Sequence, residues 1–409
     1  MLVFLGKKVN PHHSRRIKLT ISRRQVVRRD HLHSGLTESA RQHGVNLVTG
    51  MKVCDLSYVR DGIRLETTSG KIYAFDLVVG ADGIRSFVRQ TLFPNIVPKA
   101  PSKVAAYRGV LSYDKIFAEV PEARAYLRNS MDVWIGNSGY ILTYPISGGK
   151  ELNIVTAFCK DDYVTKMENV DIDEFRGYYK DYSPIIKQIL GLVGYTQRWP
   201  LLQMPPMKSW SNDTKNVVLL GDAVHCMQNH MAQGAATAME DGAFLGAVIG
   251  EVVRGVVSIC EAVEIYEKRR MPKAWIKQQI SFTSGLVNMA TGQMARDRDV
   301  ASKPEIDAHY HNPVASPALS PTYRSWQYFC NPTSVPGVFY YDAEGDADNA
   351  ICEYLQGKGE VDDLEMLSTG LKNKWMGYVT DNGLRDTKED ANFHRELNEA
   401  DYARHGKGL

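Results

Sequence analysis

The chain has 409 residues, of which 44% are hydrophobic and 10% aromatic, a composition typical of a globular protein large enough for more than one core. Its formal net charge of +2 gives no reason to expect a nucleic acid or an anionic membrane as partner. Six cysteines without a CxxC pair argue against a zinc site and against a disulfide scaffold, and they favour a reducing compartment.

The longest apolar segment, Ala243 to Val257, is too short to span a bilayer and contains Glu251 and Arg254. We therefore expect a cytoplasmic protein without a membrane partner, and the sequence sets no oligomeric state. Charge is uneven along the chain: residues 1–30 carry nine Lys or Arg against one acid, whereas residues 341–409 carry sixteen Asp or Glu against eight Lys or Arg. Such runs are usually solvated surface, so we assign them no ligand.

The first part of the chain alternates between short strands and helices. The predicted strands lie at 15–27, 45–48, 51–59, 62–68 and 77–80, and the predicted helices at 31–43 and 84–92. Gly44 is the expected end of the first helix, and Arg60-Asp61-Gly62 is the expected turn of a hairpin.

The middle of the chain is richer in strands. They are predicted at 104–110, 131–135, 140–146 and 152–158, with one helix at 172–190. Strands at that density favour an antiparallel sheet in a separate layer that covers a substrate. The α/β pattern returns at 215–258, and 261–295 are helical in character. Beyond residue 300 we predict no long periodic segment, and we expect a loosely packed tail at the end.

Two segments carry the chemistry. In the first, the apolar run from Val217 to Leu220 predicts a buried strand, Gly221-Asp222 ends it, and Gly234 opens a helix beyond His225. This layout places a carboxylate and free backbone N–H groups at the carboxyl end of a strand, where open α/β sheets bind ligands. In the second, the strand at 77–80 is followed by Asp82-Gly83, and Gly83 permits a turn that side chains forbid.

Together these segments resemble the two inner flavin motifs of the FAD-dependent aromatic monooxygenases of the salicylate hydroxylase type (class A flavoprotein hydroxylases). The resemblance implies that FAD is the cofactor and NAD(P)H the reductant, and that a small aromatic compound is hydroxylated with O₂. By the same analogy, the compound is a polyketide-like metabolite. The FAD-binding residues that it implies are Arg29, Asp82, Gly83, Gly221, Asp222, Gly234 and Ala235. In the arginine-rich segment before residue 30, the assignment could also fall on Arg28.

The resemblance also implies two substrate residues on the strands of the middle layer. Arg108, in Ala-Tyr-Arg-Gly, would hold a phenolate, and Tyr144, in Tyr-Pro-Ile-Ser, would orient it. Tyr140 competes with Tyr144 for this second role. The histidine pairs of the chain lack the carboxylate or thiol partners that would complete a metal site, so we predict no metal.

Two departures from the family pattern stand out. The Gly-x-Gly-x-x-Gly motif, which opens the family's proteins on their first strand, occurs nowhere in this chain. Two prolines that the family places after the Gly-Asp motif are replaced by Cys226 and Asn229, which should loosen that loop. These departures raise two alternatives: a degenerate, flavin-free paralogue that binds an aromatic ligand or a partner protein, and a longer protein whose start was misassigned.

We therefore predict an α/β flavoprotein-hydroxylase fold with a Rossmann-like FAD-binding part, truncated at its N-terminus, and an antiparallel β-sheet layer over the substrate. The predicted parts are an FAD-binding part at 1–95, the substrate layer at 96–214, a second FAD-binding part at 215–260, a helical and loop region at 261–345, and an acidic tail at 346–409.

Overall fold

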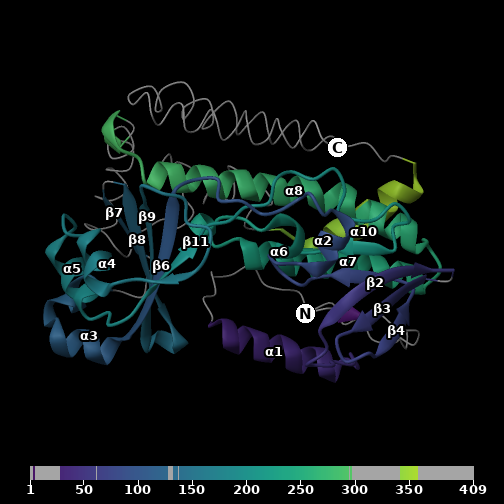
Figure 1. Ribbon diagram of the computed structural model, residues 1–409, viewed down its shortest axis with the longest axis horizontal. Helices are drawn as coiled ribbons and strands as arrows, with labels where there is room; N and C mark the ends of the chain where they lie inside the picture. Colours follow the sequence, from purple (N-terminus) through teal and green to yellow (C-terminus); the bar gives the residue numbers. More distant parts are fainter. Residues whose placement is uncertain are drawn as a thin grey trace. The chain divides into compact units, whose positions relative to one another are not determined.

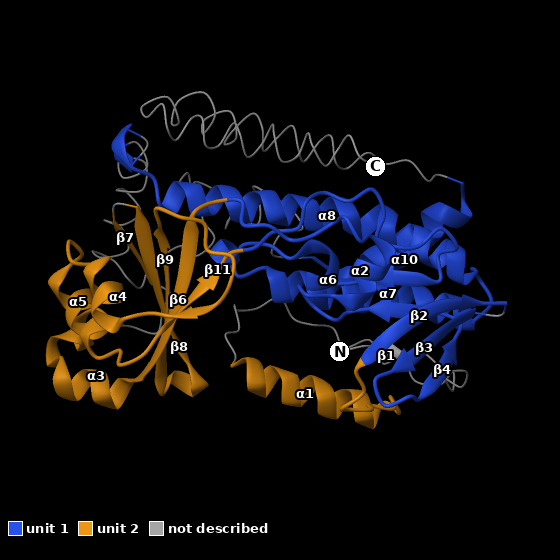
Figure 2. Ribbon diagram, viewed as in Figure 1, with its two compact units in different colours: residues 1–7, 53–101, 202–409 blue, residues 8–52, 102–201 orange. Residues whose placement is uncertain are grey.

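The computed structural model describes residues 3–4, 28–60, 62–127, 132–136, 138–293, 295–296 and 341–357. The chain divides into two compact units (Figure 2). Unit 1 comprises Met1–Lys7, Val53–Pro101 and Leu202–Leu409, and unit 2 comprises Lys8–Lys52 and Ser102–Leu201. Each unit is therefore built from segments that are far apart in the sequence. The elements named below are labelled in Figure 1.

Unit 1 is built around a sheet in which strand β5 lies between β1 and β12. β12 runs parallel to β5, whereas β1 runs antiparallel to it. The bounds of these strands are Val3–Phe4 for β1, Val78–Gly80 for β5 and Val217–Leu219 for β12. The helices of the unit are α2 (Phe87–Leu92), α6 (Asp222–His225), η3 (Asn229–Met231), α7 (Gly234–Val253), α8 (Ile259–Asn288) and α10 (Ala343–Leu355).

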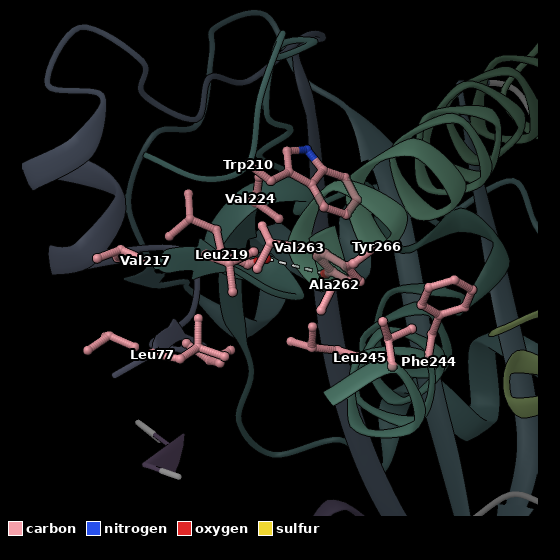
Figure 3. Close-up of a cluster of buried hydrophobic side chains, with 14 of the residues drawn as sticks. Leu77, Trp210, Val217, Leu219, Val224, Phe244, Leu245, Ala262, Val263 and Tyr266 are labelled. Atoms are coloured by element: carbon pink, nitrogen blue, oxygen red, sulfur yellow. Dashed lines mark hydrogen bonds between the residues drawn. The ribbon is translucent and has the colours of Figure 1, made fainter. Parts of the chain in front are cut away.

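The core of unit 1 forms where the buried strands meet the long helices. Leu219 of β12 and Phe244 of α7 are fully buried, and Tyr266 of α8 packs near Phe244 with ring centroids 6.3 Å apart (Figure 3). The Tyr266 hydroxyl donates to the Leu219 carbonyl at 3.2 Å, so this buried polar group has its partner inside the core.

A small antiparallel sheet completes unit 1. Its strands are β2 (Val53–Val59), β3 (Gly62–Thr67) and β4 (Ile72–Phe75), paired in that order. The predicted hairpin at 51–59 and 62–68 is thus confirmed, as β2 and β3. Val53 and Leu56, together with Ile63 and Leu65, turn into the same core as Val78 and Leu219.

Unit 2 contains an antiparallel six-stranded sheet and several helices. The strand order is β10-β11-β6-β9-β8-β7. The bounds are β6 Val104–Ser112, β7 Asp132–Gly136, β8 Gly139–Ile146, β9 Glu151–Cys159, β10 Glu168–Asn169 and β11 Gln197–Pro200. The helices are α1 (Arg29–Gln42), α3 (Tyr113–Glu119), η1 (Pro121–Ala125), η2 (Ser147–Gly149), α4 (Ile172–Gly177) and α5 (Pro184–Gly191).

Side chains on this sheet alternate between two faces. Tyr107, Ile141 and Ile154 point into the core that the sheet shares with α4 and α5. Because successive residues of a strand point to opposite faces, Arg108 and Tyr144 lie on the other face. The antiparallel layer that the strand density predicted is therefore confirmed, and the two predicted substrate residues share one of its faces.

Two predicted elements are wrong in detail. Residues 45–48 form no strand, and Val45 and Val48 are exposed. The single helix at 172–190 is two helices, because Pro184 lacks the N–H that a continuous helix needs and instead begins α5. Helices α3 and α10 were not predicted.

α10 contradicts the expectation of no periodic segment beyond residue 300. Its buried positions are Ala343, Ala347, Ala350 and Ile351, which lie on one helical face, and Asp342 caps its first turn by accepting from the Gly345 N–H. The strand predicted at 15–27 and the residues from 358 onward lie outside the described residues.

Candidate functional site

Both motifs of unit 1 follow the carboxyl ends of neighbouring parallel strands. β5 and β12 are paired so that Leu219 lies opposite Gly80. The Leu220 N–H extends the pairing by donating to the Gly80 carbonyl at 3.0 Å. The turns that carry Asp82 and Asp222 therefore leave the same edge of the sheet, where open α/β sheets bind their ligands.

The Gly221–Asp222 turn requires its glycine. Gly221 has φ 64° and ψ −141°, a conformation that is essentially restricted to glycine, and a Cβ there would lie 3.0 Å from the Ala238 Cβ. Asp222 follows as the first residue of α6 and is exposed. Among the described residues, no group makes a hydrogen bond or ion pair with its carboxylate. The carboxylate is thus available to a ligand.

The N-terminus of α7 lies beside this carboxylate. A Cβ placed on Gly234, the first residue of the helix, would lie 3.8 Å from Asp222 Oδ1. The helix is 20 residues long, its first turn contains no acidic residue, and no side chain caps it. Its N-terminus therefore offers free N–H groups, including that of the exposed Ala235, to an electron-rich ligand. The positive end of the helix dipole lies there as well. The structure brings together Gly221, Asp222, Gly234 and Ala235, as predicted.

The second turn is organised by Asp82. One oxygen of its carboxylate accepts from the Ser86 hydroxyl at 2.5 Å, and the other accepts from the N–H groups of Phe87 and Val88 at 2.7 and 3.2 Å. Gly83 has φ 81°, in the left-handed region that favours glycine. Asp82 thus fastens the turn to the start of α2.

Arg89 is a residue of this site that the sequence interpretation missed. It is buried in α2, and its guanidinium donates to the Ile84 carbonyl at 2.9 Å and to the Ala223 carbonyl at 2.8 Å. It therefore ties the turn after β5 to the turn after β12. Burial lowers the pKa of Arg89, and Cys226 and Asp82 oppose this shift. No local pattern marks such an arginine, because its two acceptors are far apart in the chain.

In unit 2, the structure separates the two candidate arginines. Arg28 makes paired hydrogen bonds to Asp30 at 3.0 Å and reaches Glu151 at 3.2 Å. These contacts, hydrogen bonds to Asp30 first, raise the pKa of Arg28. Arg29 is exposed, and none of the described acids forms an ion pair with it. Arg29 is therefore the arginine that is free to meet a phosphate.

Arg108 and Tyr144 form a cluster with Asn153, another residue that the sequence interpretation missed. Arg108 Nε donates to Asn153 Oδ1 at 3.0 Å, and Asn153 lies opposite Tyr144 in the pairing of β9 with β8. Burial raises the pKa of Tyr144, while the positive charges of Arg108 and Arg29 oppose that shift. Arg108 is exposed and Tyr144 half-buried, whereas the competing Tyr140 is buried.

A cavity of about 980 Å³ lies elsewhere in unit 2, between the start of α1 and the turn from β8 to β9. Arg28, Ser147 and Glu151 are among its lining residues, and Arg29, Arg108 and Tyr144 are not. Arg28 and Ser147 both donate hydrogen bonds to Glu151, so these polar side chains of the cavity wall already pair with one another. We therefore place no substrate in this cavity.

Comparisons with known proteins decide the family. Residues 7–280 match the family model described as an FAD binding domain. The chain is 30% identical over 251 residues to 3-hydroxybenzoate 6-hydroxylase 2 of Aquipseudomonas alcaligenes, covering 61% of this chain and 74% of that protein. It belongs to the FAD-dependent aromatic monooxygenases. The resemblance inferred from the two motifs is thereby confirmed.

Further relatives of this monooxygenase support the same family assignment. It is 27% identical to the FAD-dependent monooxygenase OpS4 of Beauveria bassiana (strain ARSEF 2860), over 80% of this chain and 73% of the relative. Among solved structures, a salicylate hydroxylase substrate complex matches with a TM-score of 0.60 and 19% identity, over 78% of this chain and 74% of that one. That likeness confirms the flavoprotein-hydroxylase fold.

The loop that lacks the family's prolines is nonetheless held in place. The Cys226 carbonyl accepts from the Met204 N–H and from Gln278 Nε2, both at 3.0 Å, and the Gln228 carbonyl accepts from the Ser281 hydroxyl at 2.6 Å. Cys226 has φ −50°, within the range that a proline ring imposes. The residue thus has a proline-like backbone conformation without the ring.

Neither a cluster of metal-binding side chains nor a membrane-spanning helix occurs in the described parts of this monooxygenase. No three His, Cys, Asp or Glu side chains there are grouped so that they could hold a metal ion. None of the described helices combines the length and the apolar character needed to cross a membrane.

Proposed function

We propose that this monooxygenase binds FAD at the two turns of unit 1 and hydroxylates a small aromatic compound that carries an anionic oxygen, using NAD(P)H and O₂. The observation that carries the proposal is the open carboxylate of Asp222 beside the uncapped N-terminus of α7. A carboxylate suits the hydroxyl groups of a ribityl chain, and a helix N-terminus suits the electron-rich edge of a flavin ring.

The remaining FAD-binding residues have separate tasks. Gly234 and Ala235 let backbone N–H groups approach the cofactor, because neither presents more than a methyl group, whereas Gly221 forms the turn that places Asp222. Asp82 and Gly83 act by shaping the second turn, since both carboxylate oxygens of Asp82 already accept bonds from the chain. Arg29 would face the diphosphate, for which a guanidinium is well suited.

Bound FAD supplies the redox chemistry, taking hydride from NAD(P)H and activating O₂, while the protein supplies placement and electrostatics. In the substrate layer, Arg108 would hold the anionic oxygen. The side-chain oxygen Oδ1 of Asn153 accepts from Arg108 Nε and fixes one edge of the guanidinium, which leaves the two terminal nitrogens for the substrate. A positive charge there favours the phenolate, in which the ring is more electron-rich and more readily hydroxylated. Tyr144, kept protonated by burial, would donate a hydrogen bond.

The test is an FAD titration of the full chain by flavin fluorescence, with Asp222→Ala and Asp213→Ala compared. Asp213 is also exposed in unit 1 and precedes β12, so its removal changes the net charge equally. We expect Asp222→Ala to weaken FAD binding by about tenfold or more, the effect of losing a hydrogen bond to a charged group, and Asp213→Ala to change it by less than about twofold. Equal affinities in all three proteins would refute the role of Asp222.

Substrate use is tested next with FAD-loaded protein. Salicylate, 3-hydroxybenzoate and 6-hydroxynicotinate serve as probes, because relatives are named for their hydroxylation. Each is scored by NADH or NADPH oxidation and by product formation. Arg108→Ala should raise KM for any probe that is turned over. A chain that binds no FAD would support the flavin-free alternative instead.

A further inference from the structure

We infer that Asp241, buried between α7 and α8, is a positioning residue that fixes the Gly221–Asp222 turn for FAD. The inference rests on the proposed role of Asp222. Asp241 is fully buried and lies within α7, beyond the first turn of the helix that begins at Gly234. It would act through the turn alone.

Three groups converge on the Asp241 carboxylate. Oδ2 accepts from the Gly221 N–H at 3.2 Å and lies 2.5 Å from His225 Nε2, while Oδ1 accepts from Arg270 Nε at 2.8 Å. Gly221 and His225 are the two ends of the turn that carries Asp222. One buried carboxylate therefore holds both ends of the turn.

The charge state of Asp241 follows from its partners. Burial opposes ionisation, but the charges and hydrogen bonds of His225 and Arg270 outweigh it and lower the pKa of Asp241. The ionised carboxylate only accepts hydrogen bonds, so His225 carries its hydrogen on Nε2. A neutral amide at position 241 would lose part of each bond.

The carboxylate is itself held by a wider buried network. Arg270 also donates to Glu240 at 2.9 Å, and Lys277 donates to the other Glu240 oxygen at 2.5 Å. The carboxylates of Glu240 and Asp241 are thus both paired with cations of α8. Tyr341, from the segment before α10, places its ring 4.6 Å from the Arg270 guanidinium. The turn is consequently anchored to α7, to α8 and to the segment at 341–357.

A role in mere folding and a role in positioning Asp222 predict different couplings. If Asp241 acts through the turn, its effect on FAD affinity requires the Asp222 side chain. If it only stabilises unit 1, the effects of the two substitutions on FAD affinity add. A double-mutant cycle separates these cases.

The cycle uses the full chain, with FAD affinity measured by fluorescence at a temperature where every variant is folded. We expect Asp241→Asn to weaken FAD binding by about tenfold to a hundredfold in the wild-type background, the range for a hydrogen bond to a charged group, and by less than about threefold in Asp222→Ala. Glu267→Gln is the matched control. Like Asp241, Glu267 is a buried carboxylate, but it lies on α8. Its hydrogen bonds go to Ser209, Trp210, Ser211 and Lys215. It should keep FAD affinity within about twofold, as expected for a site with no bond to the turn.

Additive effects, or an unchanged affinity in Asp241→Asn, would overturn the inference while the proposed role of Asp222 stood. An Asp222→Ala protein that binds FAD as well as wild type would instead refute that proposed role. If Asp241→Asn does not fold, His225→Asn provides the same cycle. Asparagine is too short to reach Asp241 from position 225, and the Asp241–Arg270 pair remains.

Discussion

The pH dependence of stability provides a quantitative test of the packing between η3 and α8. His230 follows the turn, in η3, and its Nε2 is shielded from solvent although the residue as a whole is half-buried. A Cβ at Gly285 of α8 would lie 2.5 Å from this nitrogen, so the ring packs directly against the helix backbone. Burial lowers the pKa of His230 from 6.5 to about 4.

This shift fixes the sign and the size of the effect. Between pH 6.5 and 4 the unfolded chain binds a proton at His230 that the folded chain does not, so stability falls as the pH falls. The loss is full below pH 4, where it reaches about 3 kcal/mol at 1.36 kcal/mol per unit, and it amounts to about 2 kcal/mol between pH 8 and pH 5.

The assay is urea denaturation at pH 8 and pH 5 of wild type, His230→Gln and, as control, His33→Gln, which replaces an exposed histidine of α1. Any packing loss in His230→Gln is present at both pH values, so it cancels in the comparison. The variant should lose about 2 kcal/mol less than wild type between the two pH values. Equal losses, within about 0.5 kcal/mol, would show that the ring is not kept neutral by the fold.

Three further predictions concern packing and cofactor binding. Gly285→Ala should lower the unfolding free energy by about 1–3 kcal/mol through overpacking against His230, and it should also remove the pH dependence that His230 contributes. Gly246→Ala, on an open face of α7, should instead raise the unfolding free energy by about 0.5–1 kcal/mol. Urea denaturation at both pH values measures each effect. Arg29→Ala should weaken FAD binding by about tenfold in fluorescence titrations. Arg28→Ala should leave FAD binding nearly unchanged and should change stability little, because the ion pairs of Arg28 are surface pairs. The reverse result would move the phosphate role to Arg28. Phe244→Ala should cost about 3–5 kcal/mol in urea denaturation, and a cost below about 1 kcal/mol would contradict its place in the core.

The sequence was informative wherever the local backbone or a neighbouring element calls for a particular residue type. Gly83 could be singled out because a tight turn after a strand favours glycine, and its φ of 81° agrees. Asp222 could be singled out because it follows a buried strand and precedes a helix that begins with a glycine. The strands of unit 2 were predictable from their density in the sequence, whereas Arg108 and Tyr144 were chosen from the family resemblance, and the observed pairing places both on one face. α10 was missed because its buried face consists mostly of alanines, which give little hydrophobic contrast.

What could not be predicted depends on contacts between distant segments. Arg89 joins carbonyls at positions 84 and 223, and Asp241 joins Gly221 to Arg270, so neither role leaves a pattern within any window of the sequence. These residues share a physical property: each is a charged group that burial would make costly unless its bonds were satisfied. In both cases the hydrogen bonds of the buried charged group also reach the turn that carries Asp222. If that turn binds FAD as proposed, a substitution that removes either charge from the core should therefore weaken FAD binding.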